Sequence, residues 1–209
     1  MAITKLSDQM IKMIRAGEVM VRPASIVREL ISNSIDAGAT RISVAVSPNC
    51  RDVTVHDNGH GIHHEELSLA IMPHTTSKFK GFDCIDTYGF RGEALSSICD
   101  VSHVIITSRQ AGEDAYMIQT TSSTDIRPSS FASASGTSVS VSDLFHSHYP
   151  RLAHMRSPSR EHRLCLDVVR MYAMAFPHIH FSYDKKMSNR NYTPVSFLVN
   201  DEKGRYETI

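Results

Sequence analysis

The sequence predicts an α+β fold in which strands and helices form two layers. Segments that alternate apolar with polar residues and are rich in β-branched side chains predict strands. Two long segments instead place apolar residues at helical spacing, and a length of 209 residues is enough to bury one substantial core. The predicted helices begin near 25 and 159, and the predicted strands lie at 41–46, 52–56, 103–108, 115–120, 137–141 and 180–183.

The first predicted helix begins near Ser25 and ends before Gly38. Pro23 and Ser25 are helix-start signals, and a glycine is a common stop signal. On this helix Glu29 and Asn33 are i and i+4, so they project from one face. An amide oxygen can bind magnesium and a glutamate can activate a water molecule. Alternatively, both are ordinary polar residues on the exposed face of a surface helix.

A glycine-rich turn follows the strand predicted at 52–56. Gly59 and Gly61 permit positive φ angles and a close approach of the backbone to a flat ligand. Asp57, at the end of the strand, can accept a hydrogen bond from a donor such as an adenine amino group. The same residues are also common in hairpin turns. The segment 63–71 reads as a helix, however, which disfavours a simple hairpin.

A second glycine-containing loop, 89–95, runs into another predicted helix. Backbone amides at a helix N-terminus bind anions, and Lys78 and Arg91 can add charge-assisted contacts to phosphate. The chain contains neither a G-x-x-x-x-G-K-[ST] loop nor G-x-G-x-x-G after a first strand. A phosphate site at this loop therefore requires another architecture.

Several segments, including the three above, resemble the MutL family of DNA mismatch-repair proteins. MutL belongs to the superfamily of ATPases shared with DNA gyrase, Hsp90-like chaperones and sensor histidine kinases. The wider superfamily shares only parts of this pattern, whereas the sequence of 89–95 resembles MutL itself, and Thr87 with Tyr88 resembles eukaryotic members. The matching segments are 15–19, 22–25, 29–36, 57–59, 76–78, 89–95 and 136–139.

The resemblance implies a Bergerat-type fold, a two-layer α/β sandwich whose mixed, mostly antiparallel sheet is covered by helices on one face. It implies that Glu29 is the catalytic base that activates the attacking water and that Asn33 holds a magnesium ion. Asp57 would read the adenine, supported by Thr137. The other residues implied to contact the nucleotide are Gly59, Gly61, Thr76, Ser77, Lys78, Gly89, Phe90, Arg91, Gly92, Glu93, Ala94 and Leu95.

The implied activity is hydrolysis of ATP with Mg²⁺, weak in this chain, within an ATP-gated dimeric clamp of DNA mismatch repair. The implied partners are a MutL-type paralogue or a second copy of the chain, a MutS-type mismatch-recognition protein, and DNA. The alternative is a non-hydrolysing ATP-binding switch, or a truncated paralogue that pairs with a MutL partner in meiotic recombination. A chaperone or kinase of the same superfamily is disfavoured because the chain lacks their own signatures.

We expect residues 1–205 to form the N-terminal ATP-binding domain and residues 206–209 to begin a second, transducer domain. No segment reads as a signal peptide or a membrane span, so no membrane contact is expected. A eukaryotic member would be nuclear, and any other member cytoplasmic. The four cysteines have no paired spacing, which favours reduced thiols over a disulfide framework or a zinc knuckle.

The chain departs from the family pattern at several positions. Ser32 stands where the family usually carries an acid, and Pro73 is expected to end its helix early. The segment 79–87, in the lid, is shorter than the family pattern. The segment 144–155 keeps little of the family's basic character.

Basic and acidic residues balance at 22 each, so bulk charge does not indicate nucleic-acid binding. Contact with DNA would need a local patch, for which the candidates are Arg151, Arg156, Arg160 and Arg163. His60, His63 and His64 could form a metal cluster, but a solvated loop and helix start explain them better.

Three expectations concern the second half of the chain. Residues 122–135 are expected to form a long loop or a ragged hairpin, and 150–159 another loop. The helix 159–176 is expected to bury one face, with its methionines in the core. That face comprises Leu164, Val168, Met171, Met174 and Ala175.

Overall fold

A computed structural model describes residues 7, 14, 16–18, 20–75, 93–120, 123–131, 134–155, 157–185, 195–198 and 207–208. The strands are β1 (Arg41–Val46), β2 (Val53–Asp57), β3 (His103–Arg109), β4 (Ala115–Gln119), β5 (Ser123–Ser129), β6 (Gly136–Ser142), β7 (His180–Lys185), β8 (Val195–Leu198) and β9 (Glu207–Thr208). The helices are α2 (Pro23–Asp36), the 3-10 helix η1 (His64–Glu66), α3 (Leu67–Ala70), α4 (Ala94–Val101), α5 (Tyr149–His154) and α6 (Pro158–Ala175).

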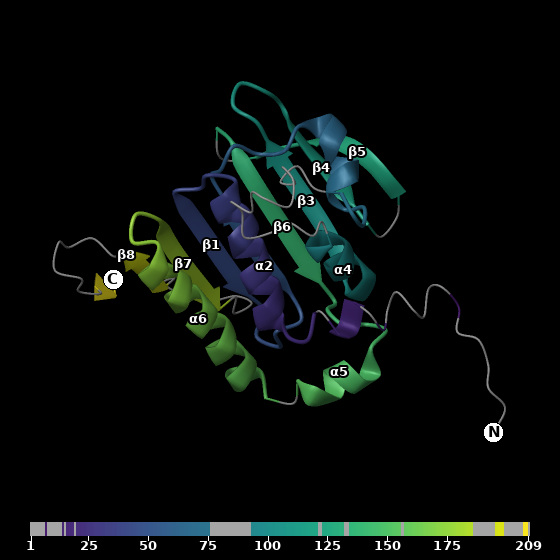
Figure 1. Cartoon of the computed structure of the whole chain (residues 1–209), viewed down its shortest axis with the longest axis vertical. Helices are drawn as coiled ribbons and strands as arrows, with labels where there is room; N and C mark the ends of the chain where they lie inside the picture. Colours follow the sequence, from purple (N-terminus) through teal and green to yellow (C-terminus); the bar gives the residue numbers. More distant parts are fainter. Residues whose placement is uncertain are drawn as a thin grey trace, which may run out of the picture.

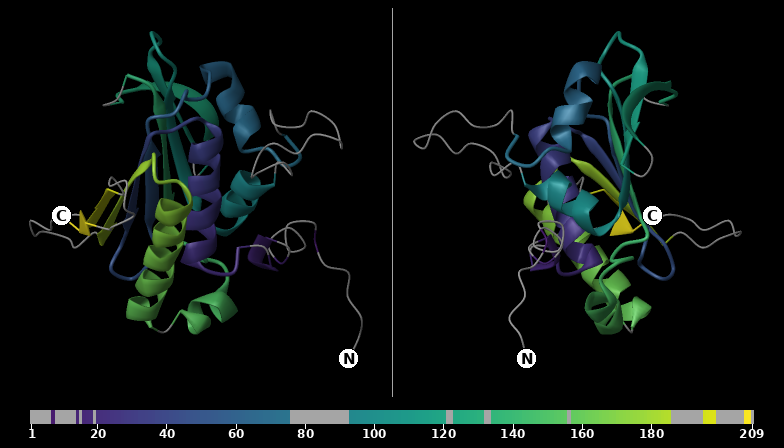
Figure 2. Two further views of the ribbon diagram at one scale, coloured as in Figure 1. Left: turned by 60° about the vertical axis from the view of Figure 1, so that its left-hand side comes forward. Right: turned by 90° about the vertical axis from the view of Figure 1, so that its right-hand side faces the viewer.

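The described strands form one sheet of nine strands in the order β5-β4-β3-β6-β2-β1-β7-β8-β9. Among their pairings only β1 with β7 is parallel, and the others are antiparallel. Helices α2, α4 and α6 lie on the same face of the sheet (Figures 1 and 2). The predicted α+β fold, with a mixed and mostly antiparallel sheet covered on one face, is confirmed.

The alternating strands place their aliphatic residues under the helices. In β1, Ile42, Val44 and Val46 are buried, whereas Arg41 and Ser43 are exposed. Because β2 and β6 run antiparallel, the end of β2 lies beside the start of β6. The sheet thereby brings together two segments far apart in sequence, and the candidate site lies at this junction.

Helix α2 packs against α6 and against β2. Pro23 occupies its first turn, where the missing N–H costs no helical hydrogen bond. Ile26, Val27 and Ile31 are fully buried at helical spacing. Gly38 follows the helix at a φ of +71°, a left-handed conformation that favours glycine and stops the helix. The predicted helix, its start signal Pro23 and its stop signal Gly38 are confirmed, whereas Ser25, the second predicted start signal, lies inside the helix, whose N-cap is Arg22.

Helix α6 buries a face rotated from the one predicted: Val168 is buried and Leu164 partly buried as expected, but the methionines are not in the core. Met171 and Met174 are 44% and 56% exposed, and the buried residues include Glu161, His162 and Tyr172. These polar groups are buried because each has a partner. Their partners are Arg22 for Glu161 (2.7 Å), the Tyr183 hydroxyl for His162 Nδ1 (2.7 Å) and the Ser32 hydroxyl for Tyr172 (2.7 Å).

The bond between Ser32 and Tyr172 accounts for one departure from the MutL pattern. Both residues are buried, and their hydroxyl groups form a hydrogen bond of 2.7 Å between α2 and α6. An acid at position 32 would place a carboxyl group in this contact. In this chain, the small hydroxyl of Ser32 instead satisfies the phenol of α6.

Of the two loop expectations, the one for 150–159 is wrong and the one for 122–135 is met in its hairpin alternative. Residues 150–159 contain the end of α5 and the start of α6, since Pro150 and Pro158 sit in the first turns of these helices, where proline is tolerated. Residues 123–129 form β5, and the ragged-hairpin alternative is confirmed because the pairing with β4 shifts register between Met117 and Gln119. β5 is an edge strand and so tolerates Pro128.

The helix predicted at 63–71 is present as η1 and α3, and it ends at Ala70, before Pro73. The chain therefore does not return from the Asp57 turn as a hairpin. In the part of the chain that the structure describes, no helix is both long and apolar enough to cross a membrane.

Candidate functional site

A buried carboxylate lies at the end of β2. Asp57 is 5% exposed and accepts hydrogen bonds from three different parts of the chain. The Ser34 hydroxyl of α2 donates to Oδ2 (2.7 Å), and the backbone N–H groups of Gly59 and Thr137 donate to Oδ1 (2.9 and 3.2 Å). These bonds fix the orientation of the carboxylate. Oδ2 retains the capacity to accept a further hydrogen bond, for example from an amino group of a ligand.

The turn after Asp57 is packed closely against its neighbours. Gly61 has a φ of +77°, and a Cβ there would lie 2.1 Å from the carbonyl oxygen of Arg109. Gly59 does not have the positive φ expected of it, but a Cβ there would lie 2.7 Å from the carbonyl oxygen of Ala37. The His60 N–H donates to the same carbonyl at 3.0 Å. Both glycines are therefore needed for close backbone approach.

A second buried hydroxyl joins this turn to β3 and β6. The Ser108 hydroxyl donates to the carbonyl oxygen of Gly136 (3.0 Å), shares a bond with the Thr137 hydroxyl (2.9 Å) and accepts from the Ile62 N–H (2.8 Å). Neither Ser34 nor Ser108 was among the predicted site residues. Ser108 could have been found as the one hydroxyl on the buried, otherwise aliphatic face of β3.

Glu29 and Asn33 lie one turn apart on α2, and both are partly buried. Asn33 directly precedes Ser34, whose side chain reaches Asp57, so this half of α2 adjoins the Asp57 turn. A carboxylate and an amide supply the hard oxygen atoms that magnesium prefers. The residues present therefore fit a magnesium ion with its remaining positions filled by water or phosphate.

The helix predicted after the loop 89–95 is present as α4, which begins at Ala94, with Glu93 at its N-cap and Leu95 in its first turn. The Glu93 side chain does not cap this N-terminus among the residues that the structure describes. The first backbone amides of a helix have no partner within it and can bind an anion. The Glu93 carboxylate instead lies 3.2 Å from Nδ1 of His74. The other predicted phosphate contacts lie outside the described residues: Thr76, Ser77, Lys78, Gly89, Phe90, Arg91 and Gly92.

The described cysteines do not provide a nucleophile. Cys50, Cys99 and Cys165 are free thiols. Burial raises the pKa of Cys50 to about 11 and that of Cys99 to about 12, so both are protonated at neutral pH. The thiolate form required for nucleophilic attack is therefore scarce at both cysteines.

Comparison with known proteins identifies the relatives of this chain. Residues 21–147 match the family described as "Histidine kinase-, DNA gyrase B-, and HSP90-like ATPase". The chain is 45% identical over 186 residues to the DNA mismatch repair protein MutL of Agrobacterium fabrum, covering 87% of this chain and 30% of that protein. It is 42% identical over 181 residues to MutL of Baumannia cicadellinicola, covering 84% and 30%. The chain thus spans about 30% of the length of these relatives.

This chain is also similar in fold to solved structures of DNA repair proteins. One, described as the N-terminal domain of a DNA repair protein, has a TM-score of 0.75 and 28% identity, covering 88% of this chain and 55% of that one. The Aquifex aeolicus MutL ATPase domain complexed with ADP has a TM-score of 0.63 and 28% identity, covering 78% and 59%. The relatives named here are bacterial, so they give no support to the leaning towards a eukaryotic member.

Proposed function

Because this chain belongs to the histidine kinase-, DNA gyrase B- and HSP90-like ATPases and is MutL-like within them, we propose that it binds and hydrolyses ATP in an ATP-gated clamp of DNA mismatch repair. The observation that carries the proposal is the buried Asp57 carboxylate, held by donors from α2, the glycine turn and β6. Such a preorganised acceptor suits an exocyclic amino group such as that of adenine.

In this proposal the two polar residues of α2 act on the phosphates. Glu29 accepts the proton of the attacking water, and Asn33 contributes its amide oxygen to a magnesium ion. A bound magnesium ion neutralises charge on the phosphate oxygens. The first amides of α4, at Ala94 and Leu95, bind the phosphates. Lys78 and Arg91, which lie outside the described residues, stay predicted phosphate contacts.

Thr137 has a supporting role in this assignment. Its N–H donates to Asp57, and its hydroxyl bonds to Ser108. Phosphoryl transfer depends mainly on positioning and charge stabilisation, so a rigid adenine site is what the reaction needs from this end of the sheet. We expect only weak turnover from these 209 residues alone.

The decisive experiment separates binding from hydrolysis. Glu29→Gln should lower phosphate release by about a hundredfold or more while leaving the affinity for a non-hydrolysable ATP analogue unchanged. Asn33→Ala should weaken the binding of that analogue in the presence of magnesium. Glu66→Gln, an exposed glutamate of η1, is the matched control and should change neither quantity.

Normal hydrolysis by a folded Glu29→Gln variant would remove the assignment of the base. A chain that binds the analogue but shows no Glu29-dependent phosphate release would instead be the non-hydrolysing switch, an alternative that the relatives do not favour. Unchanged magnesium-dependent binding by Asn33→Ala would remove the metal assignment.

We also propose that the clamp works as a dimer, with a second copy or a MutL-type paralogue, and with a MutS-type protein and DNA. For DNA, Arg160 and Arg163 are exposed on α6 and Arg151 is partly buried on α5, whereas Arg156 lies outside the described residues. Replacement of all four by alanine should reduce the salt dependence of DNA affinity. An unchanged slope would show that they do not contact phosphate.

Two further assignments complete the proposal. The bacterial relatives favour a cytoplasmic protein over a nuclear one. We propose that the ATP-binding domain comprises residues 1–205 and that 206–209 begin the next, although Glu207–Thr208 pair with β8 as β9 of the same sheet. Limited proteolysis with and without nucleotide tests that boundary, since a domain edge is cleaved first.

A further inference from the structure

Three potential metal ligands come together outside the proposed nucleotide contacts. One ligand atom from each of His63, His64 and Glu113 lies within 4.8 Å of the other two; the two histidines are partly buried, and Glu113 is exposed. His63 and His64 flank the start of η1, and Glu113 belongs to the turn between β3 and β4. His60, considered with them from the sequence, is not in the group, and its Nδ1 lies 2.6 Å from the carbonyl oxygen of Gly61.

The two segments that carry these ligands are already joined. The Ile62 N–H donates to the hydroxyl of Ser108, and Gly61 packs against the backbone of Arg109. Nε of Arg109 in turn donates to the carbonyl oxygen of Glu113 at 2.8 Å, which holds the β3–β4 turn. The backbone under the cluster is therefore fixed by contacts that do not depend on a bound ion.

The rings of the two histidines are also held in place. The His64 ring stacks on Tyr116 with centroids 4.8 Å apart and an interplanar angle of 27°. The His63 and His64 rings have centroids 4.4 Å apart. Nε2 of His63 lies 3.8 Å from Oε1 of Glu113. Two ligands of a tetrahedral zinc ion are about 3.3 Å apart, so a small side-chain movement would close this gap.

Nδ1 of His63, the ring nitrogen that would not bind the metal ion, lies near the carboxylate of Glu65. Nδ1 of His63 now accepts from the Glu65 N–H over a long 3.4 Å, and a Glu65 carboxylate oxygen lies 3.9 Å from the same nitrogen. If Nε2 bound a metal ion, the neutral ring would carry its proton on Nδ1, where it could donate to the Glu65 carboxylate. A histidine ligand that donates to a carboxylate is the usual arrangement in metal sites.

We propose that His63, His64 and Glu113 bind a divalent transition-metal ion of the zinc class. Two imidazoles and one carboxylate match zinc, nickel or cobalt, whereas magnesium prefers oxygen ligands and water. The site is thus chemically distinct from the magnesium position proposed at Asn33. A bound ion would connect the segment after the Asp57 turn to the β3–β4 turn and would stabilise both.

The test is a titration of the nucleotide-free chain of 209 residues with Zn²⁺ by calorimetry, and with Co²⁺ by visible absorption. We expect one saturable site, a rise in Tm with Zn²⁺, and no competition from excess Mg²⁺. Glu113→Gln and His64→Asn should each weaken Zn²⁺ binding by at least about tenfold, and Glu65→Gln by about tenfold through the second partner of His63. His60→Asn is the matched control and should bind as the parent does.

The absence of saturable Zn²⁺ binding in the parent chain would overturn the proposal. Equal affinities of the parent and Glu113→Gln, or an equal loss in His60→Asn, would overturn it as well. Circular dichroism establishes that each variant is folded. If His64→Asn does not fold, Glu113→Gln decides alone, because the Glu113 side chain is 42% exposed and its replacement keeps the same shape.

Discussion

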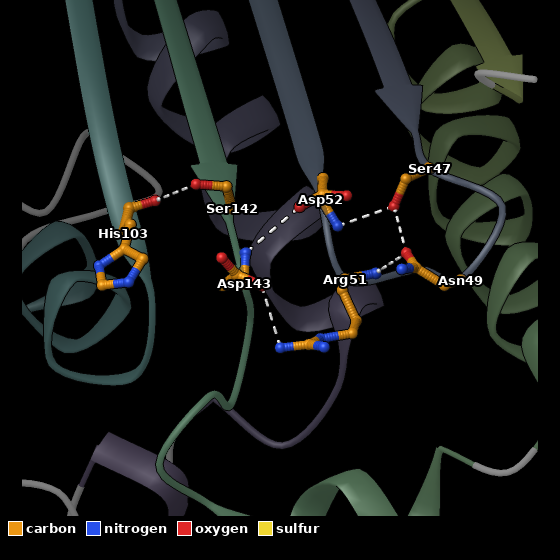
Figure 3. Close-up of polar contacts among 7 residues, drawn as sticks. All are labelled: Ser47, Asn49, Arg51, Asp52, His103, Ser142 and Asp143. Carbon is orange, nitrogen blue, oxygen red and sulfur yellow. Dashed lines mark hydrogen bonds and ion pairs between the residues drawn. The ribbon is translucent and has the colours of Figure 1, made fainter. Parts of the chain in front are cut away.

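The two ends of the central strands carry polar clusters of different construction. At the end where β1 turns into β2, hydrogen bonds link Ser47, Asn49, Arg51, Asp52 and Asp143 (Figure 3). These hydrogen bonds are divided among several acceptors. The side chain of Asp143 is 58% exposed. This cluster closes the loops of the sheet and leaves no single group organised for a ligand.

At the opposite end, three donors converge on one carboxylate that is almost completely buried. The donors to Asp57 come from α2, from the turn that follows it and from β6, and one is 80 residues away in sequence. Two glycines let the backbone pack around this acceptor. The comparison teaches that a polar cluster indicates function when it converges on one buried group. A similar number of bonds spread over exposed turns serves the fold.

The largest expected effect is a loss of stability when alanine replaces the glycine of the Asp57 turn, compared with a glycine in an open turn. Gly61→Ala places a Cβ against the backbone of Arg109 at a positive φ, so the free energy of unfolding should fall by about 4 kcal/mol. Gly112 has a similar φ of +80° but open space around it, so Gly112→Ala should cost about 1 kcal/mol. Urea unfolding measures both, and equal losses would show that the close approach at Gly61 is unimportant.

The next largest effect is expected when the buried carboxylate of Asp57 is removed, compared with the carboxylate of Asp52 at the other end of β2. Asp57→Ala leaves the three buried donors to its carboxylate without their acceptor, and should lower the free energy of unfolding by about 3 kcal/mol. Asp52 accepts from the Asp143 N–H at the exposed end, and Asp52→Ala should cost about 1 kcal/mol. Nucleotide affinity should be lost only in the first variant. A folded Asp57→Ala variant with normal affinity would contradict the site.

A smaller effect is expected for the serine behind Asp57. Ser34→Ala removes one of the three bonds to the carboxylate, so stability should fall by about 1.5 kcal/mol and nucleotide affinity should decrease. Ser47→Ala is the matched change at the opposite end and should lower stability by about 1 kcal/mol without any effect on the nucleotide. Unfolding curves and analogue binding test the pair, and a loss of affinity in Ser47→Ala would remove the distinction.

The last predicted effect is a loss of stability at acid pH. It depends on His162, which lies near the β1–β2 loop. Burial, followed by the charge of Lys185, lowers the pKa of His162 below its ordinary 6.5, and the backbone of Ser47 and Pro48 partly offsets this. Below about pH 6.5 the unfolded chain therefore binds the proton more readily. Stability should fall as pH falls through this window, by at most about 1.4 kcal/mol per pH unit.

Urea unfolding at pH values above and below that window measures the effect. His162→Gln should flatten the dependence, because the replacement does not titrate. An equal slope in the parent and the variant would show that another group is responsible.

Local pattern was sufficient for most of the helices and strands. The alternation in β1 and β2 and the end signals of α2 operate within a few residues, so they can be read without tertiary contacts. Glu29 and Asn33 share a helix face for the same reason. The helical pattern of 63–71 likewise indicated that the turn after Asp57 is not a simple hairpin.

The buried face of α6 and the partners of Asp57 were decided by the tertiary structure. The polar side chains of Glu161 and Tyr172 do not by themselves indicate burial. They are buried because Arg22 and Ser32, which are distant in sequence, supply their hydrogen-bond partners. Likewise, the donors to Asp57 and the approach of Glu113 to the histidines arise from packing between distant segments. The periodicity of the sequence predicts the face of a helix or strand on which a residue lies. Which residue of a distant segment packs against that face is determined only by the tertiary structure.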